Sequence, residues 1–492
     1  MRRLLAILHF LVFLIGTAPA KLSAQAWVPA TDAALRMAVE RLVDDHIVEI
    51  PLLAWPLPRA ELASAVQAAR SHPNLSEAQS VALSRIERAL SPPRREWFAA
   101  AGAPSALRGF EDAPRENAEA GVAVRWQGEG ALSAELQARV AIDPVDGQQL
   151  RPDGSYLAAA TGNWLWSGGW QDRWWGGGYD GSLELSSNAR PVFALSLDRQ
   201  RSMPFETRWL SWLGPWTVGS FMGALEGSRP DSNHALLWGF RAAARPLPGL
   251  EISLTRNAQF CGDKPPCSPR AFWNVVSGND NAGENVAAAD EPGNQLATYE
   301  AKWSGRIGRL PFGIYVQRTG ETIDNKFPRP LRSLNLVSLS TWGAAGDGDS
   351  WKVHVELSST TVADLDDARI GDVAYENSVF TAGYRYRGRV LGHSTDSDSR
   401  QIVFGLSYDD SGGRSWSARL RRAEINRIGS VPQPNHLLSR GPALWWGGEA
   451  TLTQPLLGGK IDLALGLERH EDESTRRDSL LGRGYLRWSQ TF

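Results

Sequence analysis

The 492-residue sequence contains two cysteines, no excess of charge of either sign, and no long apolar run after its first thirty residues. Two cysteines in a chain of this length exclude a small domain held together by disulfides. The near balance of 52 Lys and Arg residues against 54 Asp and Glu residues excludes a strongly basic nucleic-acid-binding protein. Since a membrane helix needs about 20 apolar residues, the chain also cannot be a helical membrane protein with several spans.

Motifs for catalysis and for metal binding are lacking as well. The eight histidines are dispersed, without an HExxH pair, and no GxSxG nucleophile elbow occurs. The carboxylates show no spacing that would mark the acid and base of a glycosidase. A GxGxxG match at residues 176–181 runs into an alternating segment at 182–187 rather than a helix, so we interpret it as a turn. The sequence therefore predicts a protein that is not an enzyme, with no catalytic residue, metal site or cofactor.

The first 26 residues have the organisation of a secretory signal peptide. Two arginines follow the first Met, residues 4–15 form an apolar core, and Ala24-Gln25-Ala26 is a small-residue cleavage motif. The apolar core is too short to serve as a membrane-spanning anchor. We expect cleavage after Ala26 and a mature protein that works outside the cytoplasm.

The two cysteines, Cys261 and Cys267, fit this compartment. They flank a short stretch that contains Gly262 and a Pro-Pro pair, residue types that favour a tight loop. An oxidising compartment and an even count favour a disulfide between them. Two free thiols are the alternative, and zinc fits less well because no histidine lies near and the spacing is not that of a metal motif.

Three short amphipathic helices are predicted between Thr31 and Pro93. Apolar residues recur at helical spacing in residues 35–43 and 62–69, and a capping box at Ser76–Gln79 starts the third helix. Three such helices bury little surface by themselves. We therefore expect residues 27–95 to form a small bundle that packs on a larger unit, with a linker over residues 96–118.

From residue 119 to residue 492 the apolar period changes to two. In residues 351–357, apolar side chains alternate with Lys352, His354 and Glu356, and residues 383–390 and 461–468 alternate in the same way. About eighteen such segments, each of about 8 to 12 residues and separated by turns, follow one another. The expected role of the charged side chains is to line the interior of a sheet that closes on itself.

Two architectures fit regular alternating strands: a large soluble β protein, such as a propeller, and an outer-membrane barrel. The strand length favours the barrel, because a tilted membrane-crossing strand needs about 9 to 11 residues, whereas globular strands usually have about 5 or 6. The chain also ends in Phe492 on an alternating strand, which resembles the signal read by the outer-membrane insertion machinery. We predict an all-β transmembrane barrel of about eighteen antiparallel strands behind an N-terminal helical bundle.

Tryptophan is the most abundant aromatic residue, with 21 Trp against 15 Phe and 9 Tyr. Indole rings favour membrane interfaces, where barrels carry aromatic girdles. Stacking on sugar rings is the alternative role, chiefly for Trp273 in a long loop. The tryptophans expected near strand ends or turns are Trp164, Trp166, Trp174, Trp175, Trp209, Trp212, Trp216, Trp445 and Trp446.

Several strings of the sequence resemble the Wzi family of capsule assembly proteins. Among them are PLLAWPLPRAEL, NWLWSGGWQDRWWGGGYDGSLELSSNARPVFALSLDR, WLSWLGPWTVGSFMGALEGSR and YRYRGRVLGHSTDSDSR, which follow one another along nearly the whole mature chain. The resemblance implies an eighteen-strand outer-membrane barrel with a small periplasmic helical bundle. It further implies a lectin-like role, in which the protein holds capsular or related exopolysaccharide on the cell surface and aids capsule assembly.

The longest stretch without alternation in the barrel region is residues 258–294, which include both cysteines. A loop stiffened by a disulfide and prolines loses less entropy when it binds a polymer. This stretch could equally fold inward as a plug, and the sequence does not decide between the two. The candidate polysaccharide-binding residues in it are Arg270, Trp273, Asn274, Asn279, Asp280 and Asn281.

The leading functional hypothesis is a polysaccharide-binding outer-membrane protein whose helices lie in the periplasm. Capsular or extracellular polysaccharide and outer-membrane lipid are the expected partners, and components of an export machinery are further candidates. The alternative is a diffusion channel for small polar solutes, which a charged lumen would admit. An envelope hydrolase on the barrel rim is a third hypothesis, and the absence of a recognisable nucleophile disfavours it.

Overall fold

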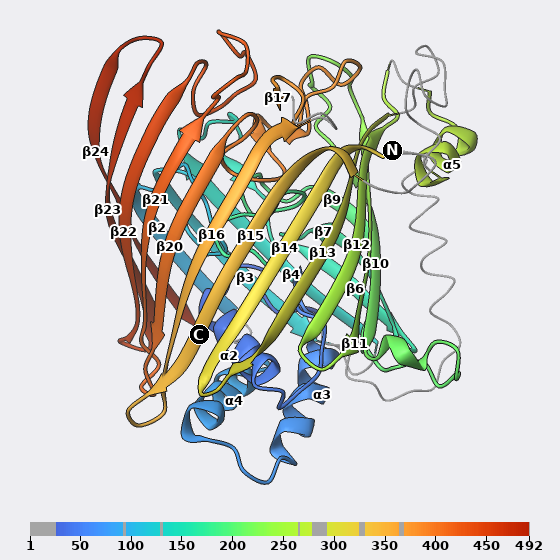
Figure 1. Ribbon diagram of the computed structural model, residues 1–492, viewed down its shortest axis with the longest axis vertical. Helices are drawn as coiled ribbons and strands as arrows, with labels where there is room; N and C mark the ends of the chain where they lie inside the picture. Colours follow the sequence, from blue (N-terminus) through green and yellow to red (C-terminus); the bar gives the residue numbers. More distant parts are fainter. Residues whose placement is uncertain are drawn as a thin grey trace.

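The computed structural model of the protein describes residues 26–91, 95–127, 131–263, 266–277, 293–323, 330–363 and 369–491. The expected signal peptide, apart from Ala26, and the expected targeting residue Phe492 lie outside these ranges. The described residues form a β-barrel with a group of helices against one end (Figure 1).

Three helices form the head of the molecule: α2 (Ala33–Asp44), α3 (Arg59–Arg70) and α4 (Glu77–Ala89). The Asp32 side chain caps α2, and Ser76 and Gln79 form the reciprocal hydrogen bonds of a capping box at the start of α4. The three predicted helices are thus confirmed. None of the helices in the described part of the chain has the length and apolar character needed to cross a bilayer.

The barrel of the described residues has eighteen antiparallel strands, each paired with the next along the chain, and the last strand pairs with the first. This architecture confirms the predicted fold class and strand number. The strands are β2 (Arg95–Ala103), β3 (Ala118–Gln127), β4 (Leu132–Ile142), β6 (Tyr156–Thr161), β7 (Trp164–Trp170), β9 (Phe193–Arg199), β10 (Trp216–Ala224), β11 (Leu236–Leu247), β12 (Leu250–Phe260), β13 (Gly293–Ile307), β14 (Leu310–Ile323), β15 (Pro330–Ala345), β16 (Asp349–Ala363), β20 (Arg400–Asp409), β21 (Ser415–Ile425), β22 (Ala443–Leu456), β23 (Gly459–Asp472) and β24 (Arg477–Thr491).

Strand β2 corrects the predicted linker over residues 96–118. Its Ala99 is the register partner of Trp488 in β24 on one side and of Ala120 in β3 on the other, so β2 closes the barrel. The strand reads REWFAAAGA, and because alanine occupies both of its faces it shows no alternation of apolar and charged residues. The barrel therefore begins at Arg95, directly after the helical head.

The strands carry polar side chains inward and apolar side chains outward. In β16, Lys352 and Glu356 are buried in the barrel, whereas Leu357 is 50% exposed on the outer wall. In β23, Glu468 is buried and the neighbouring Leu467 is 60% exposed. An outer wall of exposed apolar side chains is the surface that a lipid bilayer requires.

Most of the exposed tryptophans lie near the ends of strands that are joined by short turns, as the girdle interpretation predicts. Trp209, beside the short helix η2 (Ser211–Leu213), is the most exposed of them at 85%. Three others were wrongly assigned to the girdle, because Trp174, Trp175 and Trp445 are buried. The pair Trp174–Trp175 forms strand β8, which pairs with β1 (Ala54–Trp55) of the head instead of joining the barrel wall.

Residues 171–192, the first lumen segment, and residues 371–399, the second lumen segment, run through the lumen, and the β2–β3 connection also enters it. The alternating stretches at 182–187 and 383–390 belong to the two lumen segments and are not barrel strands, contrary to prediction. The second lumen segment contains a small hairpin of β18 (Arg385–Tyr386) and β19 (Arg389–Val390). Two further pairings extend the rim of the barrel, β5 (Leu150–Arg151) on β4 and β17 (Arg369–Ile370) on β16.

Alternation arises in 383–390 because the hairpin has an apolar and a polar side inside the protein. Tyr384 and Tyr386 are buried in a hydrophobic core together with Leu183 and Leu185 of the first lumen segment and Leu336 of the wall. A period of two therefore reports a strand with two different environments, and it does not say whether the strand belongs to the membrane wall.

Candidate functional site

The two ends of the barrel differ in their connections. At the end that carries the head, strands are joined by turns such as Gly308–Arg309 and Leu457–Gly458. At the opposite end, the connections between β12 and β13, β16 and β20, and β21 and β22 are long (Figure 1). We call these the head end and the long-loop end. A functional surface needs variable, accessible segments, and the long-loop end supplies them.

Helix α2 covers the lumen at the head end with a row of charged side chains. Arg36 donates hydrogen bonds to the carbonyl oxygens of Gly177 (2.6 Å) and Gly178 (2.8 Å) in the first lumen segment. One turn further, Glu40 forms an ion pair with Lys352 of the barrel wall. Burial raises the pKa of Glu40, but the nearby ammonium groups of Lys352 and Lys302 more than offset this and hold it well below its usual value. The head is therefore fixed to the barrel by buried charges.

The first lumen segment is anchored to the barrel wall at its centre. The Glu356 carboxylate accepts hydrogen bonds from the backbone N–H groups of Tyr179 (2.7 Å) and Asp180 (3.0 Å). The Asp180 carboxylate lies 2.8 Å from His354 Nε2 and 3.3 Å from Arg419 Nε. Burial raises the pKa of Asp180, but Arg419 and the other cations around it lower it far below its usual value. These contacts join the segment to β16 and β21, two strands of the wall that are separated only by β20.

The two lumen segments also bind each other. Tyr375 donates its phenolic hydrogen to the Leu183 carbonyl (2.8 Å), and the Asn188 side chain donates to the Val390 carbonyl (2.9 Å). Within the second segment, Arg385 pairs with Asp396 at a distance of 2.5 Å. Hydrogen bonds, ion pairs and an apolar core thus fill the lumen, and the described residues form a closed barrel rather than an open tube.

A cavity of about 410 Å³ remains at the head end, between the helical head and the wall. Trp27 and Arg59 line it on the head, and Arg139 and Asp462 line it on the strands. The β2–β3 connection contributes Glu111, which pairs with Arg419 of the wall. A charged lining of this kind suits water and small polar solutes.

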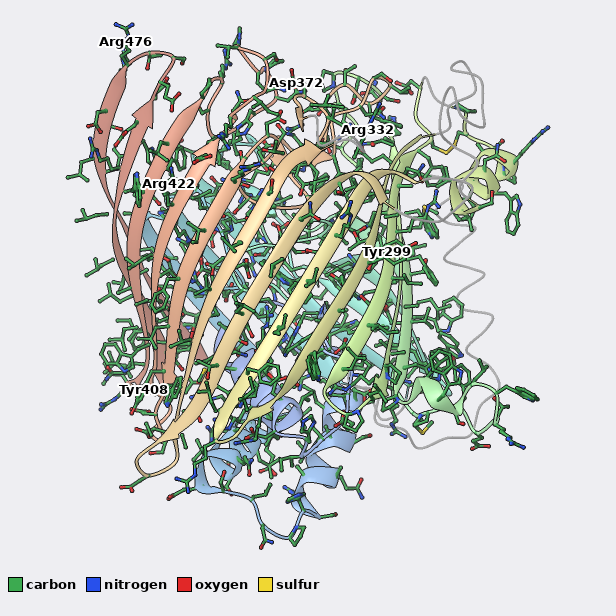
Figure 2. All side chains as sticks on the ribbon, in the orientation of Figure 1. Tyr299, Arg332, Asp372, Tyr408, Arg422 and Arg476 are labelled. Atoms are coloured by element: carbon green, nitrogen blue, oxygen red, sulfur yellow. A yellow bond between two sulfur atoms is a disulfide. The ribbon has the colours of Figure 1, made fainter. Side chains whose placement is uncertain are left out.

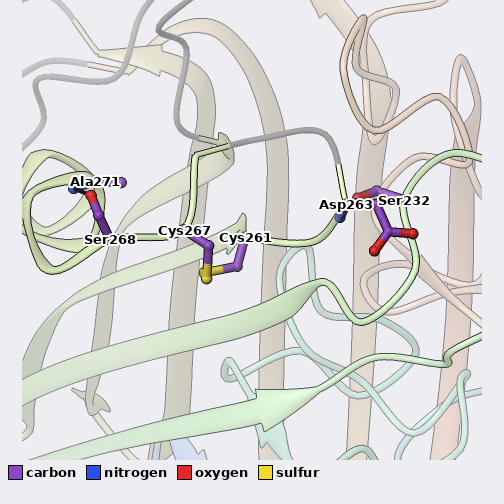
Figure 3. The surroundings of a disulfide bond; sticks show 6 residues. All are labelled: Ser232, Cys261, Asp263, Cys267, Ser268 and Ala271. Atoms are coloured by element: carbon purple, nitrogen blue, oxygen red, sulfur yellow. Dashed lines mark hydrogen bonds between the residues drawn. A yellow bond between two sulfur atoms is a disulfide. The ribbon is translucent and has the colours of Figure 1, made fainter.

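The disulfide between Cys261 and Cys267 is present, with an S–S distance of 2.02 Å and a Cα–Cα distance of 4.4 Å (Figure 3). On one side of it, the backbone of Asp263 donates to the Ser232 hydroxyl (3.0 Å). On the other side, the Ser268 hydroxyl accepts from the backbone of Ala271 (3.1 Å). The bridge therefore fixes the position at which the following helix begins.

That helix is α5 (Pro269–Ser277), and it packs against the outside of the barrel at the long-loop end. Phe272 makes an edge-to-face contact with Trp238 of β11 and a tilted contact with Phe260 of β12, with ring centroids 5.8 Å and 5.5 Å apart. Arg241, three residues further along β11, pairs with Glu300 in the lumen. Since side chains alternate along a strand, Trp238 lies on the opposite, outer face. The described part of this connection thus lies on the rim and does not plug the lumen.

Comparison with known proteins identifies the family. A family model described as capsule assembly protein Wzi matches residues 101–478. The chain belongs to this family. An uncharacterised 55.8 kDa protein in the cps region of Klebsiella pneumoniae is 27% identical over 443 residues, which cover 87% of this chain and 84% of that protein.

A solved structure has the same fold. It is that of Wzi from Escherichia coli, described as an outer membrane protein involved in group 1 capsule assembly and as a carbohydrate-binding β-barrel. The two folds superpose with a TM-score of 0.83 at 22% sequence identity, over 95% of this chain and 100% of that one. The resemblance inferred from the sequence is confirmed, and the protein is an outer-membrane β-barrel of the Wzi family.

In this Wzi-family chain, three of the six candidate polysaccharide-binding residues share α5. Trp273 is 66% exposed, Arg270 is exposed beside it, and Asn274 is half-buried. The other three, Asn279, Asp280 and Asn281, lie outside the described residues. The sequence showed this region only as a stretch without alternation. The spacing of the buried Ala271 and Val275 was the available signal for a helix.

The described residues of this family member contain no group of three or more His, Cys, Asp or Glu side chains that could hold a metal ion. The match to GxGxxG at residues 176–181 lies in the first lumen segment, where the carbonyls of Gly177 and Gly178 accept from Arg36. Its glycines allow close packing instead of phosphate binding. A Cβ on Gly177 would lie 2.7 Å from the side chains of Leu53 and Tyr315.

Proposed function

We propose that this Wzi-family protein spans the outer membrane with the helical head in the periplasm and the long-loop end at the cell surface. Outer-membrane barrels have short periplasmic turns and longer extracellular loops. The head lies at the end with the short turns, where the carboxyl-terminal strand β24 also ends (Figure 1). The apolar outer wall would contact membrane lipid, and the head would face components of an export machinery.

The proposed function is to hold capsular or related exopolysaccharide on the cell surface. The observation that carries it is the exposed face of α5, on which Trp273 and Arg270 lie next to each other at the long-loop end. An indole ring offers a flat surface for a sugar ring, and guanidinium and amide groups donate hydrogen bonds to hydroxyl and carboxylate oxygens. We include Asn279, Asp280 and Asn281 in the proposed site on the basis of their residue type and their position in the chain.

The closed lumen favours this function over a diffusion channel. Arg36 of α2 and Glu356 of the wall both hold the first lumen segment across the path that a solute would take. We also propose that the protein is not an enzyme, because the buried charged groups of the described residues serve to fix the lumen segments and the head. Surface attachment of a polymer needs neither an open pore nor a catalytic group.

The test replaces Arg270, Trp273 and Asn274 with alanine together. If α5 holds the polymer, cells with this variant retain several-fold less polysaccharide, and the missing polymer appears in the medium. The measurement is the amount of uronic acid or total sugar in cell-bound and released fractions. The amount of barrel in the outer membrane, followed by its heat-modifiable mobility on gels, should not change.

The matched control is Trp209→Ala, which removes the most exposed indole at the head end. This variant should retain the same amount of polymer as the wild type. Unchanged cell-bound polysaccharide in the triple variant would reject α5 as the binding site, and increased total polymer synthesis or export would point to a role before attachment.

A further inference from the structure

Two connections at the long-loop end meet at Asp372. Its carboxylate accepts hydrogen bonds from the backbone N–H of Ser430 (2.9 Å) and from the Gln433 side chain (2.6 Å), both in the connection between β21 and β22. Its own backbone N–H donates to Asp398, which precedes β20 (2.8 Å). Figure 2 shows Asp372 among the loops at this end. Residues distant in the sequence are thus brought together in one place.

Three side-chain oxygens converge beside Gly429 in this place. A Cβ built on Gly429 would lie within 3.0 Å of Asn426 Oδ1, Asp398 Oδ2 and Asp372 Oδ1. Asn426 and Asp398 are fully buried, whereas Asp372 is exposed. Because Gly429 has no side chain, one amide oxygen and two carboxylate oxygens converge closely on its backbone, and we call this arrangement of oxygens the cradle.

Of the three oxygens that face Gly429, Asp398 Oδ2 and Asp372 Oδ1 each accept a hydrogen bond, whereas the third, on the buried side chain of Asn426, lacks a partner among the described residues. In the described part of the chain, neither the Oδ1 nor the Nδ2 atom of Asn426 has a hydrogen-bond partner, and Asp398 Oδ1 has none either. By contrast, the neighbouring Asp396 pairs with Arg385. A buried polar group or charge without a partner costs free energy, so a group that satisfies these oxygens would stabilise the loops.

From this geometry we propose that Asp372, Asp398 and Asn426 bind a divalent cation, with Ca²⁺ as the best fit. Ca²⁺ prefers carboxylate, amide and water oxygens and accepts irregular sites with 6 to 8 ligands. Zinc would favour nitrogen or sulfur ligands, which these three side chains do not offer. The remaining positions would be filled by water and backbone carbonyl oxygens. The cation joins the β16–β20 connection to the β21–β22 connection at the cell surface.

This site lies in other connections than α5 and does not rest on polysaccharide binding. Sequence spacing could not show it, because its ligands come from residues 372, 398 and 426. The expected affinity is that of extracellular calcium modules, with a Kd of about 10⁻⁴–10⁻³ M. Calcium at the cell surface would then keep both loops in one arrangement.

The test compares full-length wild-type protein with Gly429→Ala in detergent. The added methyl would collide with Asn426 Oδ1 and would displace this oxygen, and the backbone of Gly429 is not in the left-handed region. Equilibrium dialysis against CaCl₂ at millimolar concentration should show one Ca²⁺ fewer per chain in the variant. The thermal unfolding midpoint should rise with Ca²⁺ in the wild type and fail to rise in the variant.

The matched control is Gly482→Ala, where a Cβ meets no atom within 4 Å. It should bind as much Ca²⁺ as the wild type, and any Ca²⁺ held by co-purified membrane glycolipid is common to all samples. Asn426→Ala, which removes the side-chain amide and leaves both carboxylates, should weaken binding at least tenfold. This variant keeps the proposal testable if Gly429→Ala fails to fold. Equal Ca²⁺ binding by all the folded variants and the wild type would overturn the proposal and leave a hydrated pocket.

Discussion

Single residues in the lumen show how closely this barrel is filled. Gly181 in the first lumen segment lies against the buried imidazole of His393 in the second, and a Cβ at position 181 would collide with that ring. The two segments can pass each other only because glycine has no side chain there. Because the interior is closely packed, one added methyl group at such a position must displace its neighbours.

The first prediction is that Gly181→Ala destabilises the protein by about 1–3 kcal/mol, the usual cost of overpacking a core. The measurement is the free energy of unfolding in urea. Gly482→Ala serves as the control because its methyl meets open space, and it should change the free energy by less than about 0.5 kcal/mol. Equal stability of both variants would show that the lumen segments can separate freely.

Glu184 gives a second residue-level prediction. It is fully buried in the first lumen segment, and burial, reinforced by the charge of Glu300, raises its pKa to about 8. The folded protein therefore holds a proton on Glu184 that the unfolded chain releases above pH of about 4.5. The contribution of this group to stability is fully present at low pH and is lost as the pH rises towards 8.

Glu184→Gln should remove that dependence. The midpoint of urea unfolding is measured between pH 5 and pH 9 for the wild type and the variant. The wild-type midpoint should fall more steeply with rising pH than that of the variant, whose amide stays neutral throughout. Parallel profiles of the two proteins would contradict a raised pKa, because titrations at all other groups are shared.

At the scale of elements, α2 is amphipathic in an unusual way, since its polar side is buried as well as its apolar side. Leu35, Val39 and Leu42 pack in the core of the head, and Glu40 and Asp44 meet lysines of the barrel wall. The apolar side was visible in the sequence. The burial of the charged side could not be inferred from the sequence, because its partners lie about 260 to 310 residues further along the chain.

The third prediction concerns this contact. Glu40→Ala removes the carboxylate that pairs with the buried Lys352, whose other carboxylate neighbour, Asp44, is 3.9 Å away, and breaking such a buried pair costs about 3–5 kcal/mol. The head of the variant should detach more readily, which limited proteolysis of the folded protein would detect as faster cleavage before Arg95. Glu87→Ala, which removes an exposed partner of Arg70, should cost less than about 1 kcal/mol and leave the cleavage rate unchanged.

At the scale of the whole molecule, the barrel wall and its contents have separate roles. The wall spans the membrane, and the lumen segments and the head close it. Trp170 and Phe193 are register partners in β7 and β9, so a short turn could join these strands directly. The first lumen segment is therefore dispensable for the connectivity of the wall.

The last prediction follows from this separation. Purified wild-type protein in a planar bilayer should show no steady conductance, because the lumen is filled. A variant in which a short glycine-serine turn replaces residues 172–191 should conduct, since both the Arg36 and the Glu356 anchors lose their partners. A steady open pore in the wild type would reinstate the diffusion channel, and a closed variant would mean that the second lumen segment seals the barrel alone.

Some features could be predicted because they follow from local chemistry. The capping box at Ser76 starts a helix wherever the chain places it, and the alternation around Lys352 and Glu468 fixes which side chains share a face. The disulfide between Cys261 and Cys267 could be inferred because the two cysteines lie close together in the sequence and the expected compartment is oxidising. Strand β2 escaped detection because alanine fits both a lipid-facing and a lumen-facing position.

The sequence alone determined the class of this protein. It predicted an outer-membrane barrel of about eighteen two-faced strands, a small helical head, and a family resemblance that the family match confirms. Only the tertiary structure decided which alternating segments form the wall and which fill the lumen, and that α5 lies outside the barrel. It also decided which charges meet, as at Glu40 and at Asp372. Periodicity depends on neighbours a few residues apart, whereas the filling of the lumen depends on contacts between segments that are hundreds of residues apart.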